Sequence, residues 1–254
     1  MNTKLSVNIN KIALLRNSRE SNTPDLVEYA KKIIGYGAQG ITIHPRPDQR
    51  HIKVSDIALI KNSIDVELNI EGNPFTTPLP SHRTNTADYP GFMQLIEEYQ
   101  PEQTTLVPDL DHQLTSDHGF NIKENYHLLE PIVKKIKDLG SRVSIFLDPD
   151  IEQISLAHSM GADRVEFYTG PFAHEYKNNV SIAHYVDAAE HAHTIGMEIN
   201  AGHDLSLENL SAFLEVAPHT KEVSIGHALI SDALLYGLQT TIKKYLNCIN
   251  NNLT

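Results

Sequence analysis

One local pattern recurs along the chain: an amphipathic stretch ends in a glycine, and a β-rich run follows within a few residues. It is found where the residues from Gly35 to Gly40 precede ITIH, Gly140 precedes RVSIFLD, Gly161 precedes RVEFYTG, and Gly196 precedes MEINAG. A glycine just past a helix end is a common helix cap, and a strand directly after it completes a strand–helix–strand unit. Repetition of this unit predicts a parallel sheet.

The chain contains eight such β-rich runs. They are LSVNI near residue 5, GITIH near 40, VELNIE near 66, TTLVP near 104, RVSIFLD near 142, RVEFYT near 164, MEINA near 197 and EVSIG near 222. Helical patterns lie between them at 25–36, 53–63, 123–138, 180–195 and 229–246. The segment 72–91 is rich in proline and threonine, which predicts a loop or insertion after the third strand.

The predicted strands alternate between apolar and polar residues. The first run has Val7 and Ile9 in one phase and Ser6 and Asn8 in the other, and the other runs alternate in a similar way. Strands of an open sheet with helices on both faces read as continuous apolar runs, so the alternation favours a closed barrel with a polar interior. An antiparallel sheet with one wet face would also alternate, but the helices between the strands argue against it.

The chain length agrees with the barrel. At 254 residues the chain has the size of a (β/α)8 barrel, which needs about 250 residues. We therefore predict an α/β fold, a single TIM-barrel domain over 1–254 with a few additional helices.

Composition excludes several classes of function. The net charge of -11 opposes binding to the phosphate backbone of nucleic acid, so we expect no nucleic-acid partner. No apolar run approaches the ~20 residues of a membrane helix, and the first residues lack the apolar core of a secretory signal, so we expect a cytoplasmic location. The single cysteine, Cys248, allows neither an internal disulfide nor a cysteine metal site.

Active sites of (β/α)8 barrels lie at the carboxyl ends of the strands. The predicted strand ends and the loops after them supply Asn8, Asn10, Arg16, Arg19, His44, Arg46, Arg50, His51, Glu71, Thr115, Asp148, Glu166, His203, Gly226 and His227. Any one of these residues could have a structural role. Their convergence on one end favours function, because the strand-end rule placed them without using their identity.

Carboxylates and imidazoles in a partly closed site can be tuned to act as acids and bases, which predicts proton-transfer chemistry. Arginine side chains donate paired hydrogen bonds to phosphate oxygens. Gly202 and Gly226 follow the last two strands, where such barrels often bind phosphate with backbone N–H groups. A small phosphorylated substrate is therefore expected.

Two other chemistries fit the sequence less well. A Schiff-base aldolase would need a lysine at a strand end, and only the loop residue Lys11 is available. A metal hydrolase would need clustered ligands. His44, Glu71 and His203 could bind a metal, but their spacing is not diagnostic.

Six stretches resemble the signature segments of the pyridoxine 5′-phosphate synthase family. They are VNINKIALLRNSR, GITIHPRPDQRHI, LNIEGNP, RVEFYTG, INAGHDL and SIGHALI, in this order between residues 7 and 230. The resemblance implies a barrel enzyme, assembled as a homo-octamer, that uses neither a metal nor an organic cofactor. It implies condensation of 3-amino-2-oxopropyl phosphate with 1-deoxy-D-xylulose 5-phosphate, giving pyridoxine 5′-phosphate, phosphate and water.

The resemblance also implies residue roles. His44 and Glu71 would be acid/base residues, His203 the proton donor and Glu166 a stabiliser of a charged transition state. The residues implied for the amino-ketone phosphate are Asn8, Arg19, Asp204, Gly226 and His227, and those for the deoxyxylulose phosphate are Asn10, Lys11, Arg46, His51 and Thr115.

Three positions depart from the family pattern. The Asp-His pair common in the family is Asn10 and Lys11 here, and the glycine usual after the donor histidine is Asp204. These departures are the one hint of an alternative, a non-catalytic sugar-phosphate binder, although a binder has no need of four proton-transfer residues. A metal-assisted isomerase on the same barrel is a third hypothesis, which chelator sensitivity would reveal.

Overall fold

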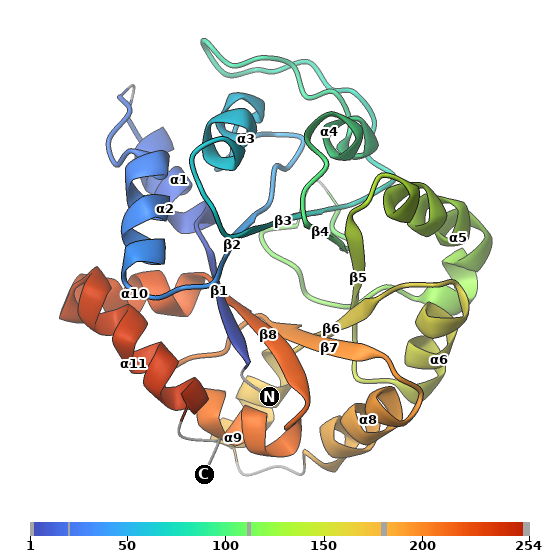
Figure 1. The fold of residues 1–254 in the computed structure, drawn as a ribbon. Coiled ribbons are helices and arrows are strands. Elements are labelled where there is room, and N and C mark those ends of the chain that lie inside the picture. Colours follow the sequence, from blue (N-terminus) through green and yellow to red (C-terminus); the bar gives the residue numbers. More distant parts are fainter. Residues whose placement is uncertain (1–2, 20, 111–112, 179–181, 251–254) are drawn as a thin grey trace.

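The computed structural model describes residues 3–19, 21–110, 113–178 and 182–250, and within them eight strands close into a parallel barrel. Each strand pairs with its neighbours in chain order, and the last returns to the first (Figure 1). The strands are β1 (Lys4–Asn8), β2 (Gly40–Ile43), β3 (Glu67–Gly72), β4 (Gln103–Leu106), β5 (Arg142–Leu147), β6 (Arg164–Tyr168), β7 (Glu198–Gly202) and β8 (Thr220–Ile225). The predicted (β/α)8 barrel is confirmed.

Helices surround the barrel (Figure 1). They are α1 (Asn10–Asn17), α2 (Leu26–Gly35), α3 (Val54–Lys61), α4 (Phe92–Tyr99), α5 (Ile122–Asp138), α6 (Ile151–Ser159), α7 (Gly170–Lys177), α8 (Ala183–Thr194), α9 (Leu210–Val216), α10 (His227–Tyr236) and α11 (Leu238–Asn250). Asp25, Asn121 and Asp150 cap the starts of α2, α5 and α6 by accepting a bond from a backbone N–H three residues later. The described residues contain no helix long and apolar enough to span a membrane.

One helix prediction and one loop prediction were wrong. The pattern over 229–246 forms two helices, because Gly237 has a φ of 77° that ends α10 and turns the chain into α11. The segment predicted as a loop after the first strand begins instead with α1, whose Ile12 and Ala13 are buried in the core. The start of the predicted helix 180–195 falls outside the described residues.

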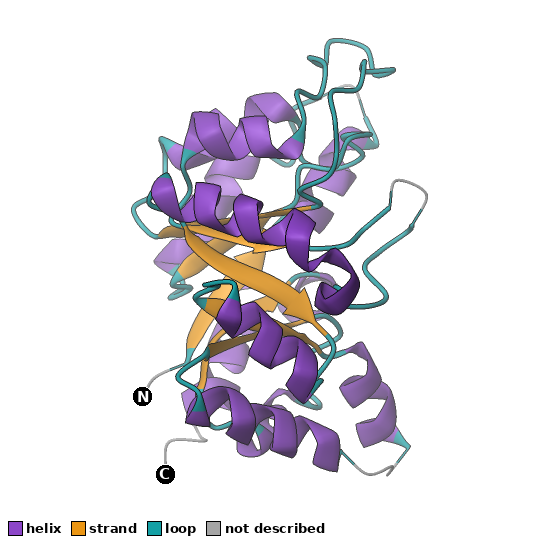
Figure 2. Cartoon of the chain, turned by 90° about the vertical axis from the view of Figure 1, so that its right-hand side faces the viewer, coloured by secondary structure: helices purple, strands orange, loops and turns teal. Residues whose placement is uncertain are grey.

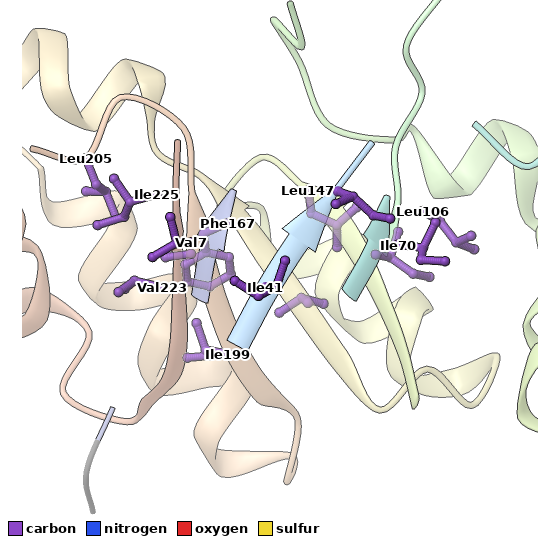
Figure 3. Close-up of a cluster of buried hydrophobic side chains, with 14 of the residues drawn as sticks. Val7, Ile41, Ile70, Leu106, Leu147, Phe167, Ile199, Leu205, Val223 and Ile225 are labelled. Atoms are coloured by element: carbon purple, nitrogen blue, oxygen red, sulfur yellow. The ribbon is translucent and has the colours of Figure 1, made fainter. Parts of the chain in front are cut away.

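The apolar phase of the strands packs outward against the helices. Val7, Ile41, Ile70 and Val223 are fully buried in this layer, which Figure 3 shows in close-up. Each such side chain contributes about 1.5–3 kcal/mol when it leaves water, so this layer supplies a large share of the stabilising free energy. The core thus lies between barrel and helices.

The polar phase lines the barrel interior, as predicted from the alternation. The hydroxyl oxygens of Ser6 and Thr42 lie 2.7 Å apart, and the Thr105 hydroxyl donates to Asn69 Oδ1 at 3.0 Å. All four side chains are buried. Because buried polar groups are costly when unpaired, these cross-strand bonds allow a polar interior to exist.

The amino-terminal end of the barrel is filled by an ionic layer. Arg142 pairs with Glu67 and donates to Gln103 Oε1, and Arg164 donates to the same oxygen and to Glu198 Oε2. These long side chains cross the barrel and occupy its lower interior. A ligand in the barrel is therefore expected at the opposite, carboxyl end.

Two long loops project from the carboxyl end of the barrel (Figure 2). Residues 73–91 contain no helix or named strand, and one antiparallel bridge between Leu79 and Tyr89, with both backbone bonds at 2.9 Å, holds this segment. We call residues 107–121 the β4 loop; its residues 111–112 lie outside the described residues.

Candidate active site

The strand ends bring most of the predicted site residues to one mouth. Asn8 is the last residue of β1, and Glu71 is the last but one of β3. His44 directly follows β2, and His203 directly follows β7. Glu166 points inward from β6 and lies deeper in the barrel. The strand-end rule therefore locates an acid/base cluster.

His44 and Glu71 form the first pair of this cluster. His44 Nδ1 lies 3.9 Å from Glu71 Oε2, and Asn8 Nδ2 donates to the same carboxylate oxygen at 3.3 Å. Asn10 Oδ1 accepts from the His44 backbone N–H at 3.0 Å and so fixes the end of β2 against the start of α1. The Asn10 side chain thus connects the start of α1 to the end of β2 beside the His44–Glu71 pair.

The surroundings move the pKa values of the pair in opposite directions. Burial, reinforced by the charges of Arg46 and Arg50, lowers the pKa of His44 to about 3. Burial, reinforced by the charges of Glu166, Asp109 and Glu222, raises the pKa of Glu71 well above its ordinary value. The lowered pKa of His44 favours a neutral imidazole that can accept a proton, and the raised pKa of Glu71 favours the protonated carboxyl group, which can donate one.

Glu166 is the buried carboxyl group below this pair. It is 4% exposed, and burial together with the charge of Glu222 raises its pKa to about 8. A Cβ atom at Gly202 would lie 2.5 Å from Glu166 Oε1, so only glycine leaves room for this carboxyl group. Gly202, for which the sequence predicted phosphate binding, thus leaves the space that the Glu166 carboxyl group occupies.

His203 lies on the other side of the mouth in an unusual backbone conformation. His203 and Asp204 have φ values of 83° and 58°, a left-handed turn that is costly for residues with a Cβ. Thr169 Oγ1 holds the turn by donating to the carbonyl oxygens of Gly202 and His203. Strained turns that the fold enforces are concentrated at functional sites.

The His203 ring is held from several directions. Its Nε2 lies 2.9 Å from Thr115 Oγ1, its Nδ1 lies 3.4 Å from Asp204 Oδ2, and the ring packs edge-on against Tyr168. The interaction with His203 lowers the pKa of Asp204, so this carboxylate is charged and faces the imidazole. The departure at position 204 therefore adds a counter-charge beside the predicted proton donor.

The predicted residues Arg46 and His51 lie together at the β2 side of the mouth. Arg46 Nη1 donates to Asp109 Oδ2 at 2.8 Å, and both side chains are 4% exposed. The His51 ring lies 6.0 Å from the His44 ring, and burial lowers the pKa of His51 well below its usual value. The mouth here combines one fixed cation with neutral imidazoles.

The remaining predicted residues lie around the rim. Lys11 is partly buried in the first turn of α1, and Arg19 is exposed just past its end. Gly226 packs against Asn8, where an added Cβ would be 3.1 Å from the Asn8 Cβ, and His227 begins α10 beside it. The structure places Lys11, Gly226 and His227 near the mouth, whereas within the described part of the chain no contact links Arg19 to it.

Three residues from the wider list have structural roles. Arg16 forms a buried two-pronged ion pair with Asp56, with bonds of 2.7 and 2.8 Å. Asp148 accepts the backbone N–H of Gly119 and anchors the β4 loop. Arg50 pairs with Asp48 and donates to the Gln113 carbonyl oxygen.

Sequence reasoning missed Asp109 and Tyr168. Tyr168 is the last residue of β6, and Asp109 follows β4 by three residues, so the same strand-end rule could have found both. Within the described part of the chain, no group of three or more metal-ligating side chains is present. A set of ligands for the metal-dependent alternatives is therefore not present in the described residues.

Comparisons with known proteins agree with this geometry. The family model for "Pyridoxal phosphate biosynthesis protein PdxJ" matches residues 5–251. A pyridoxine 5′-phosphate synthase of Xanthomonas campestris pv. campestris is 48% identical over 260 residues, covering 100% of this chain and 99% of the relative. One of Porphyromonas gingivalis is also 48% identical, covering 96% of this chain and 97% of the relative.

Solved structures with low sequence identity share the fold. 3-Keto-L-gulonate-6-phosphate decarboxylase from Vibrio cholerae is 11% identical and aligns with a TM-score of 0.63, covering 99% of each chain. Thiamine phosphate pyrophosphorylase from Pyrococcus furiosus is 10% identical with a TM-score of 0.59, covering 99% of this chain and 97% of that one. These similarities show the fold alone.

Proposed function

The chain belongs to the PdxJ family of pyridoxal phosphate biosynthesis proteins, and we propose that its barrel mouth condenses 3-amino-2-oxopropyl phosphate with 1-deoxy-D-xylulose 5-phosphate. The family makes it an enzyme of vitamin B6 biosynthesis with pyridoxine 5′-phosphate synthase activity. Joining an amine to a ketone and closing a ring require repeated proton transfers. The opposed pKa shifts of His44 and Glu71 are the observation that carries the proposal.

We assign the proton transfers to residues by their ionisation and position. Neutral His44 accepts a proton from the substrates, and protonated Glu71 donates one, so the pair serves as base and acid at the same pH. His203, held by Thr115 and Asp204 on the opposite side, donates a proton to the departing group. Glu166 lies below the ring-forming atoms and stabilises positive charge when it releases its own proton.

We assign the two phosphate groups to two sets of residues around the mouth. The backbone around Asp204 and Gly226, with His227 at the start of α10, binds the amino-ketone phosphate together with Asn8 and Arg19. Arg46, His51 and Thr115 bind the deoxyxylulose phosphate, with Asn10 and Lys11 beside them. In this proposal the two reactive carbonyl groups lie over the His44–Glu71 pair.

We further propose that the enzyme assembles as a homo-octamer in the cytoplasm and needs no metal or organic cofactor. The resemblance of the sequence to the family implies the assembly, and the location is an expectation from the sequence. The titratable side chains at the mouth supply the acid/base chemistry that the reaction needs.

The test is steady-state kinetics on chelator-treated protein with both substrates. Glu71→Gln and His203→Ala should each lower kcat by at least about 100-fold, the usual share of one acid/base group. Glu215→Gln on α9 and His158→Ala on α6 are matched controls at exposed positions and should retain full activity. Full activity of both site variants, in folded protein, would contradict the assignment, and loss of activity on chelation would favour a metal-dependent enzyme.

A further inference from the structure

The arginine that we assign to the deoxyxylulose phosphate is already bound to acceptors of the β4 loop. Besides the Asp109 carboxylate, these include the carbonyl oxygens of Leu110 and Gln113, both of which accept from Nη2, at 2.8 and 3.1 Å. A phosphate group would occupy the same kind of position that the Asp109 carboxylate holds, since both are anionic acceptors for the N–H groups of a guanidinium. The Asp109 carboxylate and a bound phosphate group would therefore need the same guanidinium.

A contribution to stability alone does not explain the Asp109–Arg46 pair. Asp109 is 5% exposed, and its Oδ1 has no hydrogen-bond partner among the described residues. Its charge also contributes to raising the pKa of Glu71. Buried ion pairs are often no more stabilising than apolar side chains of the same volume. A carboxylate retained here with one unpaired oxygen calls for a functional explanation.

Space for movement lies directly beside this carboxylate. Asp109 lines a cavity of about 290 Å³ together with Pro47, Asn73, Phe75 and Leu110. Within the described residues, the only hydrogen bond between the Asp109 backbone and the residues that line this cavity joins its carbonyl oxygen to Asn73 Nδ2, at 3.0 Å. The side chain can thus rotate away from Arg46 without displacing the strands.

We propose that Asp109 is the internal counter-ion of Arg46 in the free enzyme, that the phosphate group of the deoxyxylulose substrate displaces it, and that Asp109 thereby sets the affinity for this substrate. The inference rests on the proposed function of Arg46. It makes Asp109 a positioning residue, because it acts on substrate through Arg46. It involves no covalent step.

The substitution Asp109→Asn separates charge from shape. Asparagine keeps an oxygen that accepts from Arg46 Nη1, and the carbonyl contacts of Leu110 and Gln113 still hold the guanidinium. What is lost is the competing negative charge. The free variant then carries a buried cation without a charged partner and should melt at a lower temperature, whereas bound phosphate should restore its stability.

The experiment combines kinetics with thermal melting in inorganic phosphate. Asp109→Asn should lower KM for 1-deoxy-D-xylulose 5-phosphate about fivefold, since one repulsive charge near the dianion is removed, and should leave KM for the amino-ketone unchanged. Inorganic phosphate should raise Tm more in this variant than in the wild type. Asp117→Asn, an exposed carboxylate of the same loop, is the matched control and should change neither quantity.

A third variant separates failure of the inference from failure of the assignment. Arg46→Met combined with Asp109→Asn leaves no unpaired charge and should raise KM for the deoxyxylulose substrate strongly. If the double variant behaves so while Asp109→Asn alone leaves KM unchanged or higher, Arg46 binds phosphate but Asp109 does not compete, and the inference is wrong. If the double variant keeps the wild-type KM, Arg46 does not hold the phosphate, and both the assignment of Arg46 and the inference about Asp109 are wrong. A Tm loss in Asp109→Asn that phosphate does not reverse would mean a purely structural pair.

Discussion

Replacing Glu166 with glutamine is expected to stabilise the folded protein while it reduces activity. Burial and the charge of Glu222 raise the pKa of Glu166 from 4.5 to about 8. Below pH 4.5 the group is protonated in both the folded and the unfolded chain and contributes nothing. Between pH 4.5 and 8 the unfolded chain releases the proton and the folded chain keeps it, so stability falls as the pH rises through this window.

The magnitude follows from the same pKa difference. At pH 7 the cost to the folded state is about 3 kcal/mol, and at pH 5 it is below about 1 kcal/mol. Glutamine removes this cost, while one poorly bonded amide hydrogen offsets about 1 kcal/mol of the gain. At about 2 °C per kcal/mol for a chain of this size, Tm should rise about 4 °C at pH 7 and hardly at all at pH 5.

The assay is thermal unfolding of wild type and variant at both pH values. Glu198→Gln is the matched control, because burial of Glu198 is outweighed by its bond to Arg164 and its pKa is lowered. That substitution removes a stabilising charge and should bring no gain at pH 7. An equal Tm gain for Glu166→Gln at both pH values, or none at pH 7, would refute the claim that Glu166 is protonated in the folded enzyme.

Three further predictions concern single contacts. Arg16→Met leaves the buried Asp56 charge unpaired and should cost about 3–5 kcal/mol in urea unfolding, whereas a cost below 1 kcal/mol would show that the pair is not buried in solution. Gly202→Ala places a Cβ 2.5 Å from Glu166 Oε1 and should lower kcat about tenfold or more at nearly normal Tm. An unchanged kcat would show that the position of the Glu166 carboxyl group does not depend on a glycine at 202. Thr115→Val removes the bond to the donor imidazole and should lower kcat about fivefold, and a change confined to KM would instead limit this threonine to substrate binding.

The barrel could be predicted because each strand alternates between polar and apolar residues. Alternation such as Ser6 next to Val7 sends one side chain into the polar interior and the next into the core, and this depends on sequence alone. The strand-end rule then located His44 and Glu71, which the structure places 3.9 Å apart. Both results needed only the period of a strand and the direction of a parallel sheet.

Other features depend on contacts between distant segments, which no local pattern shows. The break at Gly237 was hidden because the apolar period continues across it on both sides. Arg16 was a candidate for substrate binding, and only the three-dimensional structure brings Asp56, 40 residues away in the sequence, to it. In the same way, the pairing of Arg46 with Asp109 joins loops that are 63 residues apart.

The most direct test of the account is ³¹P NMR of the wild-type reaction with both phosphorylated ketones in equal amounts. We expect both substrate signals to fall together and to be replaced by one signal from inorganic phosphate and one from pyridoxine 5′-phosphate, in equal amounts. Loss of only one substrate, or release of phosphate without the new phosphate ester, would contradict the proposed condensation at this mouth.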